Sequence, residues 1–336
     1  MERQAKVSRH EWAWCVAFVA AAALLLGVAA NILRPAREAF GSTWNAYLAE
    51  PRDTVDVLFL GSSYAYCDWN PGAMYDESGL TGYVMAGGEQ TVGVTYYYLK
   101  EALKTQSPKV VVLEGSSLFF DRYESFTQIN VGYMPWGLNR VGAILEYAEP
   151  EKREGLFVDL IFYHDRWKEL TRGDVQQAIP IRQRDHLKGH TAMDGVYDGV
   201  AGGGPYLSEM RQSEEIYQQN LEDFARLGAL CQEEGIDLIV AIAPTYSQYT
   251  PEVYQRLERD VRERGATRLV NWADSFEEIG LDPSRHLYDG GHLNQEGAKS
   301  SIPPSPARRR RSLPSGAVDD SPGRANSPRY TRKWRS

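Results

Sequence analysis

The chain has 336 residues, and its 43% hydrophobic and 11% aromatic content excludes an intrinsically disordered protein. Three cysteines exclude a disulfide-stapled scaffold and leave no CxxC pair for zinc or redox chemistry. The net charge of −8 combines +7 over residues 300–336 with −15 over residues 1–299. A body this acidic is a poor binder of phosphate backbones, so we expect no nucleic-acid partner.

The N-terminal segment predicts a membrane anchor. Residues 12–30 form an uncharged apolar run, which as a helix spans about 28 Å, close to the hydrocarbon thickness of a bilayer. Because basic residues precede this run, we assign 1–11 to a cytoplasmic basic segment. Residues 12–33 are then a transmembrane helix or uncleaved signal anchor, with a single pass through the cell membrane and an extracytoplasmic body. A cleaved signal peptide and a buried core helix are the alternatives.

From 39 to 299, short apolar runs alternate with amphipathic stretches and predict a single α/β domain. We expect strands at 55–60, 83–86, 109–113, 236–242 and 268–271, and helices at 91–104, 213–234 and 251–264. This alternation predicts a three-layer sandwich with a mostly parallel sheet, covered on both faces. Sites in such sheets form at the carboxyl ends of the strands. Periodicity disappears between about 171 and 212, which indicates a surface insertion or lid.

Two short stretches carry residues suited to nucleophilic catalysis. Gly61-Ser62-Ser63 follows the first expected strand of the body, where a serine hydroxyl is exposed above the sheet and the next helix directs N–H groups at an oxyanion. Asp289 lies three residues before His292, so one loop can supply a general base and the carboxylate that orients its ring. Taken singly, these stretches are also compatible with a plain turn and a solvated loop histidine.

Together the two stretches resemble the SGNH/GDSL hydrolase superfamily over roughly 55–298. Its nucleophile block corresponds to Gly61-Ser62-Ser63, and its Asp-x-x-His block corresponds to residues 289–292. The N-terminal anchor and the Gly-Ser-Ser sequence are most similar to the envelope branch, which includes the D-type protein of teichoic-acid D-alanylation and the alginate O-acetylation proteins. The resemblance implies an SGNH-hydrolase-like, flavodoxin-like fold with Ser63 as nucleophile, His292 as base and Asp289 as the residue that orients it.

The resemblance also implies an oxyanion hole, in which two family asparagines are absent. Ser63 N–H would be one donor and Gly87 N–H a second, although Met85-Ala86-Gly87 lacks the asparagine of the family's Asn-x-Gly block. Ser117 stands where the Gly-x-Asn-Asp block places the oxyanion asparagine. Loss of one such donor typically lowers the rate about 10²–10³-fold. This difference favours a specialised acyltransferase or a degenerate site over a general esterase.

Other polar residues are weaker candidates. His164 and Arg166 stand side by side with Asp165 and are candidate substrate-binding residues, with a helix cap or local ion pair as the alternative. Glu114 lies at the end of the third expected strand, where a carboxylate would face the site or act structurally. No metal-ligand spacing and no Walker or dinucleotide motif occurs in the sequence, so we expect no metal and no cofactor.

The leading hypothesis is a membrane-anchored extracytoplasmic serine hydrolase or O-acyltransferase that acts on acyl esters of a cell-envelope polymer. Expected partners are an envelope polysaccharide or teichoic-acid-like polymer, the membrane, and a membrane-bound acyltransferase. The alternatives are a catalytically degenerate envelope binding or assembly protein and a secreted lipase or esterase. Residues 300–336 contain six prolines and eight serines, and we expect a disordered basic tail in place of a closing helix.

Overall fold

The computed structural model describes residues 9–35, 41, 43–121, 124–178, 184–199, 206–207, 214–245, 248–273 and 275–301. Its centre is a parallel sheet in the order β2-β1-β3-β5-β7. These strands are β1 (Val57–Gly61), β2 (Gly82–Ala86), β3 (Val110–Glu114), β5 (Asp237–Ile242) and β7 (Arg268–Asn271). The predicted α/β class is therefore confirmed, and all pairs within this sheet are parallel. In chain order the arrangement is 2-1-3-4-5, a doubly wound order of the flavodoxin-like type.

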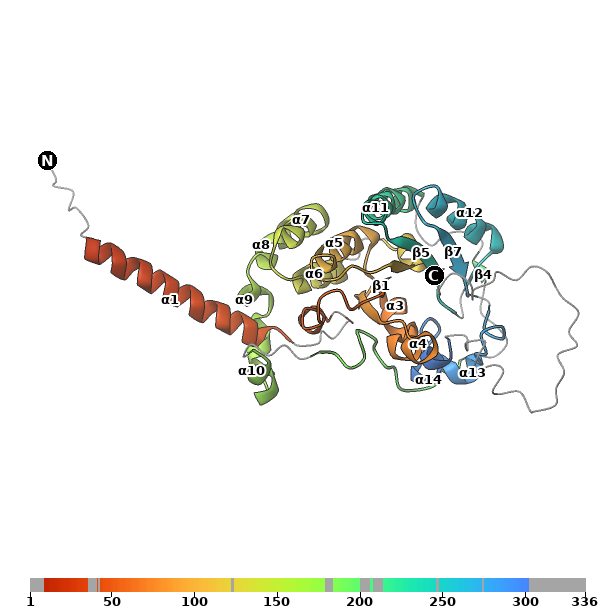
Figure 1. Ribbon diagram of the computed structural model, residues 1–336, viewed down its shortest axis with the longest axis horizontal. Coiled ribbons are helices and arrows are strands. Elements are labelled where there is room, and N and C mark those ends of the chain that lie inside the picture. Colours follow the sequence, from red (N-terminus) through yellow and green to blue (C-terminus); the bar gives the residue numbers. More distant parts are fainter. Residues whose placement is uncertain are drawn as a thin grey trace, which may run out of the picture.

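Helices cover both faces of the sheet (Figure 1). Successive strand residues point to opposite faces, so Leu58 and Leu60 of β1 enter the larger core and Val57 and Phe59 enter the smaller one. The larger core contains residues of α5 (Val92–Ala102), α7 (Leu138–Tyr147), α11 (Glu214–Glu233) and α12 (Pro251–Arg262). The smaller core contains residues of α3 (Ser63–Asp68) and α4 (Pro71–Ser78). The sheet and the helical layer on each of its faces give three layers.

Shorter elements complete the described part of the chain. They are α2 (Trp44–Tyr47), α6 (Glu124–Tyr133), α8 (Arg153–Leu156), α9 (Asp159–Phe162), α10 (Arg172–Ala178), α13 (Pro283–His286), α14 (Gln295–Ser300), the 3₁₀ helices η1 (Gly115–Phe119), η2 (Pro150–Lys152) and η3 (His164–Lys168), and the paired strands β4 (Tyr206–Leu207) and β6 (Gln248–Tyr249). Helix α10 falls where no periodicity was recognised. Helix α14 packs against α3 and supplies a short helix after the Asp/His loop. The tail predicted over 300–336 lies, from 302 onward, outside the described residues.

Helix α1 (Arg9–Leu33) projects from the body (Figure 1). None of its residues is buried, and it is long and apolar enough to cross a membrane. It begins three residues before the expected start at 12 and ends at the expected residue, 33. The segment 1–8, which includes most of the predicted cytoplasmic segment, lies outside the described residues.

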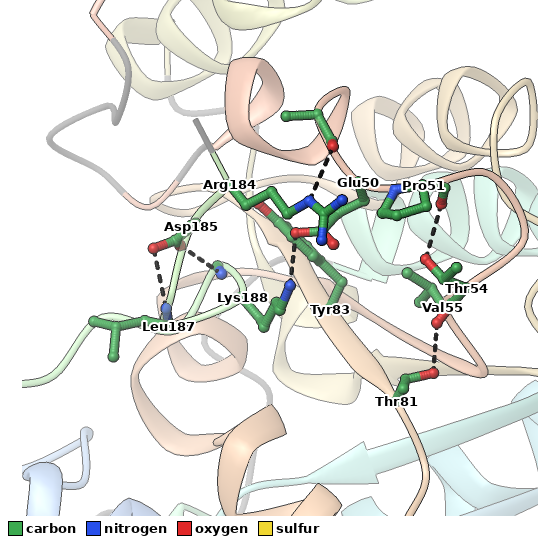
Figure 2. A network of polar contacts seen from close by, with 12 residues as sticks. Glu50, Pro51, Thr54, Val55, Thr81, Tyr83, Arg184, Asp185, Leu187 and Lys188 are labelled. Atoms are coloured by element: carbon green, nitrogen blue, oxygen red, sulfur yellow. Dashed lines mark hydrogen bonds and ion pairs between the residues drawn. The ribbon is translucent and has the colours of Figure 1, made fainter. Parts of the chain in front are cut away.

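Residues 184–199 of the predicted insertion, here called the strap, contain a turn at 186–189 and otherwise no helix or strand. Figure 2 shows the beginning of the strap, from Arg184 to Lys188, beside Glu50 of the body. Lys188 forms an ion pair with Glu50 at 2.7 Å, and its carbonyl accepts the N–H of Val84 in edge strand β2 at 2.8 Å. Arg184 Nε donates to the carbonyl of Ala49 at 3.4 Å. These contacts hold the strap to the body beside β2.

Candidate active site

The turn between β1 and α3 places Ser63 at the carboxyl end of the sheet. Gly61 ends β1 with φ +131°, and a Cβ at this position would lie 2.7 Å from Cβ of Glu114. Only glycine therefore fits both the backbone conformation and the close approach of β3. Ser62 is the N-cap of α3, and Ser63 is its first residue. The turn thus places the Ser63 side chain at the start of a helix, as the sequence predicted.

The loop between α13 and α14 carries the other two residues. Asp289 Oδ1 accepts the N–H groups of Gly291 and His292, each at 2.8 Å. These bonds fold the loop so that Nδ1 of His292 lies 2.9 Å from Asp289 Oδ2. The opposite ring nitrogen, Nε2, lies 2.8 Å from Ser63 Oγ. Ser63, His292 and Asp289 thus form one continuous chain of hydrogen bonds.

The electrostatics of this chain suit proton transfer. Partial burial by itself raises the pKa of Asp289, but hydrogen bonds from the His292 ring and from the Gly291 and His292 N–H groups outweigh it and lower that pKa to about 2. The carboxylate is therefore ionised at neutral pH and accepts a hydrogen bond from the Nδ1–H group of His292. This tautomer leaves the Nε2 lone pair facing the Ser63 hydroxyl.

Tyr64 covers one face of the histidine, a contact that the sequence analysis missed. Its ring stacks on that of His292 with centroids 4.9 Å apart and planes 22° apart. A Cβ on Gly291 would lie 2.9 Å from the Tyr64 hydroxyl, so a larger residue there would push against this ring. The only available signal was an aromatic residue directly after the serine.

Asp68 ties the serine helix to the histidine loop. It is the last residue of α3 and is fully buried, and its Oδ1 accepts the N–H of Leu293 at 2.8 Å. Burial raises the pKa of Asp68 well above its ordinary value. Helix α3 therefore carries Ser63 at one end and holds the residue after His292 at the other. Nothing in the local sequence distinguished this carboxylate.

Glu114 supports the serine turn from behind. It is fully buried, and its two carboxylate oxygens accept the Ser62 hydroxyl at 3.0 Å and the Ser116 N–H at 2.7 Å. Burial raises the pKa of Glu114 to about 6 against the opposing effect of these hydrogen bonds. Of the two serines in the turn, Ser62 is bonded to Glu114 and Ser63 to His292.

Two of the predicted oxyanion donors are engaged within the protein. The N–H of Gly87 donates to the carbonyl of Gly61 at 3.3 Å. The hydroxyl of Ser117, which is buried, donates to the carbonyl of Glu114 at 2.6 Å. An amide that the sequence analysis missed lies beside Gly87: Asn130 of α6 donates to the carbonyl of Gly88 at 2.9 Å. A Cβ on Gly87 would lie 2.0 Å from Asn130 Oδ1, so the amide occupies the space that a side chain there would need.

Comparison with known proteins does not assign the chain to a family. No model of a protein family and no curated protein matches the chain. The function proposed below therefore rests on the residues and elements of the chain itself.

The strap braces the histidine loop on its outer side. The N–H of Gln295 donates to the carbonyl of Met193 at 2.9 Å, and Asn294 Nδ2 donates to the carbonyl of Gly195 at 2.8 Å. The N–H of Thr191 donates to the carbonyl of Tyr66 in α3 at 2.7 Å. The strap therefore contacts both elements that supply the catalytic candidates.

The structure does not bring His164 and Arg166 to the other candidates. Both belong to η3, which packs against α1 and α9. His164 is exposed, with Nδ1 2.6 Å from the Ile161 carbonyl. Arg166 donates to the carbonyl of Leu33 at the end of α1 and pairs with Asp174 at 2.8 Å. The helix-cap and ion-pair interpretation accounts for these contacts.

Proposed function

We propose that the chain is a membrane-anchored extracytoplasmic serine hydrolase or O-acyltransferase that acts on acyl esters of a cell-envelope polymer. The observation that carries the proposal is the hydrogen-bonded chain from Ser63 through His292 to Asp289. The resemblance of the two motifs to the SGNH/GDSL hydrolases supports the same chemistry. Helix α1 supports attachment to a membrane, because it is long and apolar enough to cross one.

In this mechanism, Ser63 Oγ attacks the carbonyl carbon of an acyl ester while His292 Nε2 takes the hydroxyl proton. The resulting oxyanion is held by N–H groups at the start of α3, and Asp289 stabilises the imidazolium. Collapse of the tetrahedral intermediate breaks the bond to the leaving alcohol, which receives the proton from His292. Water in hydrolysis, or a polymer hydroxyl in transfer, then attacks the acyl carbonyl and loses its proton to His292. The bond between the acyl group and Ser63 Oγ breaks, and Oγ takes that proton back.

The exposure of the site favours a large acceptor. The side chains of His292 and Asp289 are 23% and 44% exposed, so within the described part of the chain both are open to solvent. An envelope polysaccharide or a teichoic-acid-like polymer can approach such a surface site from solvent. A membrane-bound acyltransferase is the partner that would supply acyl groups on the same side of the membrane.

A second function, that of a catalytically degenerate envelope binding or assembly protein, is favoured by one observation. The Gly87 N–H and the Ser117 hydroxyl both donate to carbonyls of the protein, so neither is free to stabilise an oxyanion in this conformation. A protein of this kind would keep the fold and the polymer-facing surface without turnover.

Labelling with a fluorophosphonate probe tests the proposal, because only an activated serine reacts covalently with it. We expect the full chain to be labelled, Ser63→Ala to abolish labelling, and the matched control Ser62→Ala to retain it, since the Ser62 hydroxyl faces Glu114. Absence of labelling in the wild-type chain would favour the degenerate binding protein. Labelling together with a preference for long-chain esters over short acyl donors would favour the third function, a lipase or esterase.

A further inference from the structure

Exposed apolar side chains of the body gather where α1 joins it. Among the described residues outside α1, eleven large hydrophobic side chains are exposed, and seven of them fall between 136 and 175. Five of these seven line a cavity with α1 or belong to elements that contact it: Trp136, Val158, Ile161, Trp167 and Val175. Each is at least 43% exposed. We call these five residues the juxtamembrane patch.

A cavity of about 360 Å³ lies between α1 and part of the juxtamembrane patch. Leu26, Gly27 and Ala30 line it from α1, and Trp136 and Val158 line it from the body. The lining also includes the polar residues Asn31, Arg34 and Asp159. The three α1 residues belong to the apolar run expected to cross the hydrocarbon of a bilayer. Because residues that line one cavity lie side by side, Trp136 and Val158 lie at the depth of the last turns of that run.

Hydrogen bonds fix the orientation of the body relative to α1. The last carbonyls of a helix have no partner within it, and Arg166 Nη1 donates to one of them, that of Leu33, at 2.6 Å. Arg34, directly after α1, donates to the carbonyl of Met134 at 2.8 Å. Arg166 is itself held by Asp174 of α10. These bonds keep η3 and α10 in contact with α1, and Figure 1 shows α10 beside its end. The orientation of the body relative to α1 is therefore fixed.

We propose that the juxtamembrane patch lies in the interfacial region of the bilayer that α1 crosses. Two of its five members are tryptophans, which concentrate at membrane interfaces because the ring is apolar and its N–H reaches water. Residues 136–175 carry six basic and eight acidic side chains, a net charge of −2. The patch therefore binds through apolar contact and needs no anionic lipid. The inference rests on α1 crossing a bilayer and is independent of catalysis.

Depth measurement in the full chain tests this inference. Cys15 is exposed on α1, whereas Cys67 and Cys231 are buried, so Cys15→Ala gives a background for single labelling sites. Ile161→Cys and Trp167→Cys would each carry a polarity-sensitive fluorophore. Chains reconstituted in phosphatidylcholine nanodiscs would be compared with and without a doxyl-labelled phosphatidylcholine that quenches nearby fluorophores.

We expect blue-shifted emission and doxyl quenching at 161 and 167. The control Tyr75→Cys, on α4 and also exposed at 56% in the wild-type residue, should show neither. Replacing half of the phosphatidylcholine by phosphatidylglycerol should leave the quenching unchanged. Absence of quenching at 161 and 167 would overturn the proposal and would point to a protein partner or a second copy over the patch. Equal quenching at 75, or quenching that requires the anionic lipid, would also overturn it.

Discussion

Replacement of Glu114 by glutamine should stabilise the protein at neutral pH and leave its stability unchanged in acid. Glu114 is fully buried and has a pKa of about 6 in the folded chain, compared with an ordinary value of 4.5. Between these pH values the folded chain retains a proton that the unfolded chain has lost. The free energy of unfolding of the wild type therefore falls as the pH rises through this window.

The magnitude follows from the two pKa values. A difference of roughly 1.5 between them corresponds to about 2 kcal/mol of unfolding free energy, reached in full above the folded-state pKa. Glutamine does not ionise, and its carbonyl oxygen can still accept the Ser116 N–H that Glu114 accepts at 2.7 Å. The amide also remains within reach of the Ser62 hydroxyl. Glu114→Gln should therefore gain about 2 kcal/mol relative to wild type between pH 4 and pH 8.

Urea unfolding of the full chain in detergent, followed by tryptophan fluorescence at several pH values, measures this difference. Wild type and Glu114→Gln serve as a matched pair, so the titration of groups that do not interact with Glu114 cancels in the comparison. The variant should unfold at higher urea concentration at pH 8, and the two curves should converge near pH 4. A difference that stays constant across this range would refute the argument that burial raises the pKa of Glu114.

Three further predictions concern the site and a buried ion pair of the body. Ser63→Ala and His292→Ala should each lower turnover of an acyl ester roughly 10³–10⁶-fold, and the double variant should have little less activity than either single variant. Additive losses of activity would show that the two residues do not act as one unit. Asp68→Leu should lower the free energy of unfolding by about 1–3 kcal/mol, because the Leu293 N–H loses its acceptor. Asp68→Asn keeps an acceptor oxygen and should keep the wild-type thermal midpoint. Equal losses of stability in the two variants would contradict the role of that hydrogen bond. Arg140 is fully buried, and its guanidinium pairs with the carboxylate of Asp159 at 2.7 Å. Arg140→Met should therefore lower the free energy of unfolding in urea by about 3–5 kcal/mol. A neutral effect would show that the carboxylate of Asp159 finds another partner.

The strands of the sheet could be predicted from the sequence because a strand buried on both faces is a continuous apolar run. The runs at 109–113 and 236–242 become β3 and β5 with each boundary displaced by no more than one residue. Helix α11 was equally clear, since its apolar residues recur at helical spacing. These elements can be predicted because the pattern of apolar residues that specifies each of them lies within the element itself.

The short helices between 124 and 178 carried no comparable signal. Helices α8 and α9 have four residues each, and helices this short form in proteins through tertiary contacts rather than local propensity. The same limit applied to Asp68, whose role depends on the N–H of Leu293, 225 residues away in the sequence. His164 and Arg166 were singled out as a polar cluster, but the position of η3 beside α1 depends on packing.

The sequence by itself determined the chemical groups of the candidate site and their local geometry. Asp289 and His292 are three residues apart, so one loop brings carboxylate and imidazole together, and Gly61 permits the turn that exposes Ser63. Only the tertiary structure decided that His292 meets Ser63 across 229 residues of chain. It also decided that the Gly87 N–H and the Ser117 hydroxyl are engaged by protein carbonyls. The reason is physical: these distances depend on strand order and on buried polar contacts between α3 and the histidine loop, which no short segment of sequence specifies.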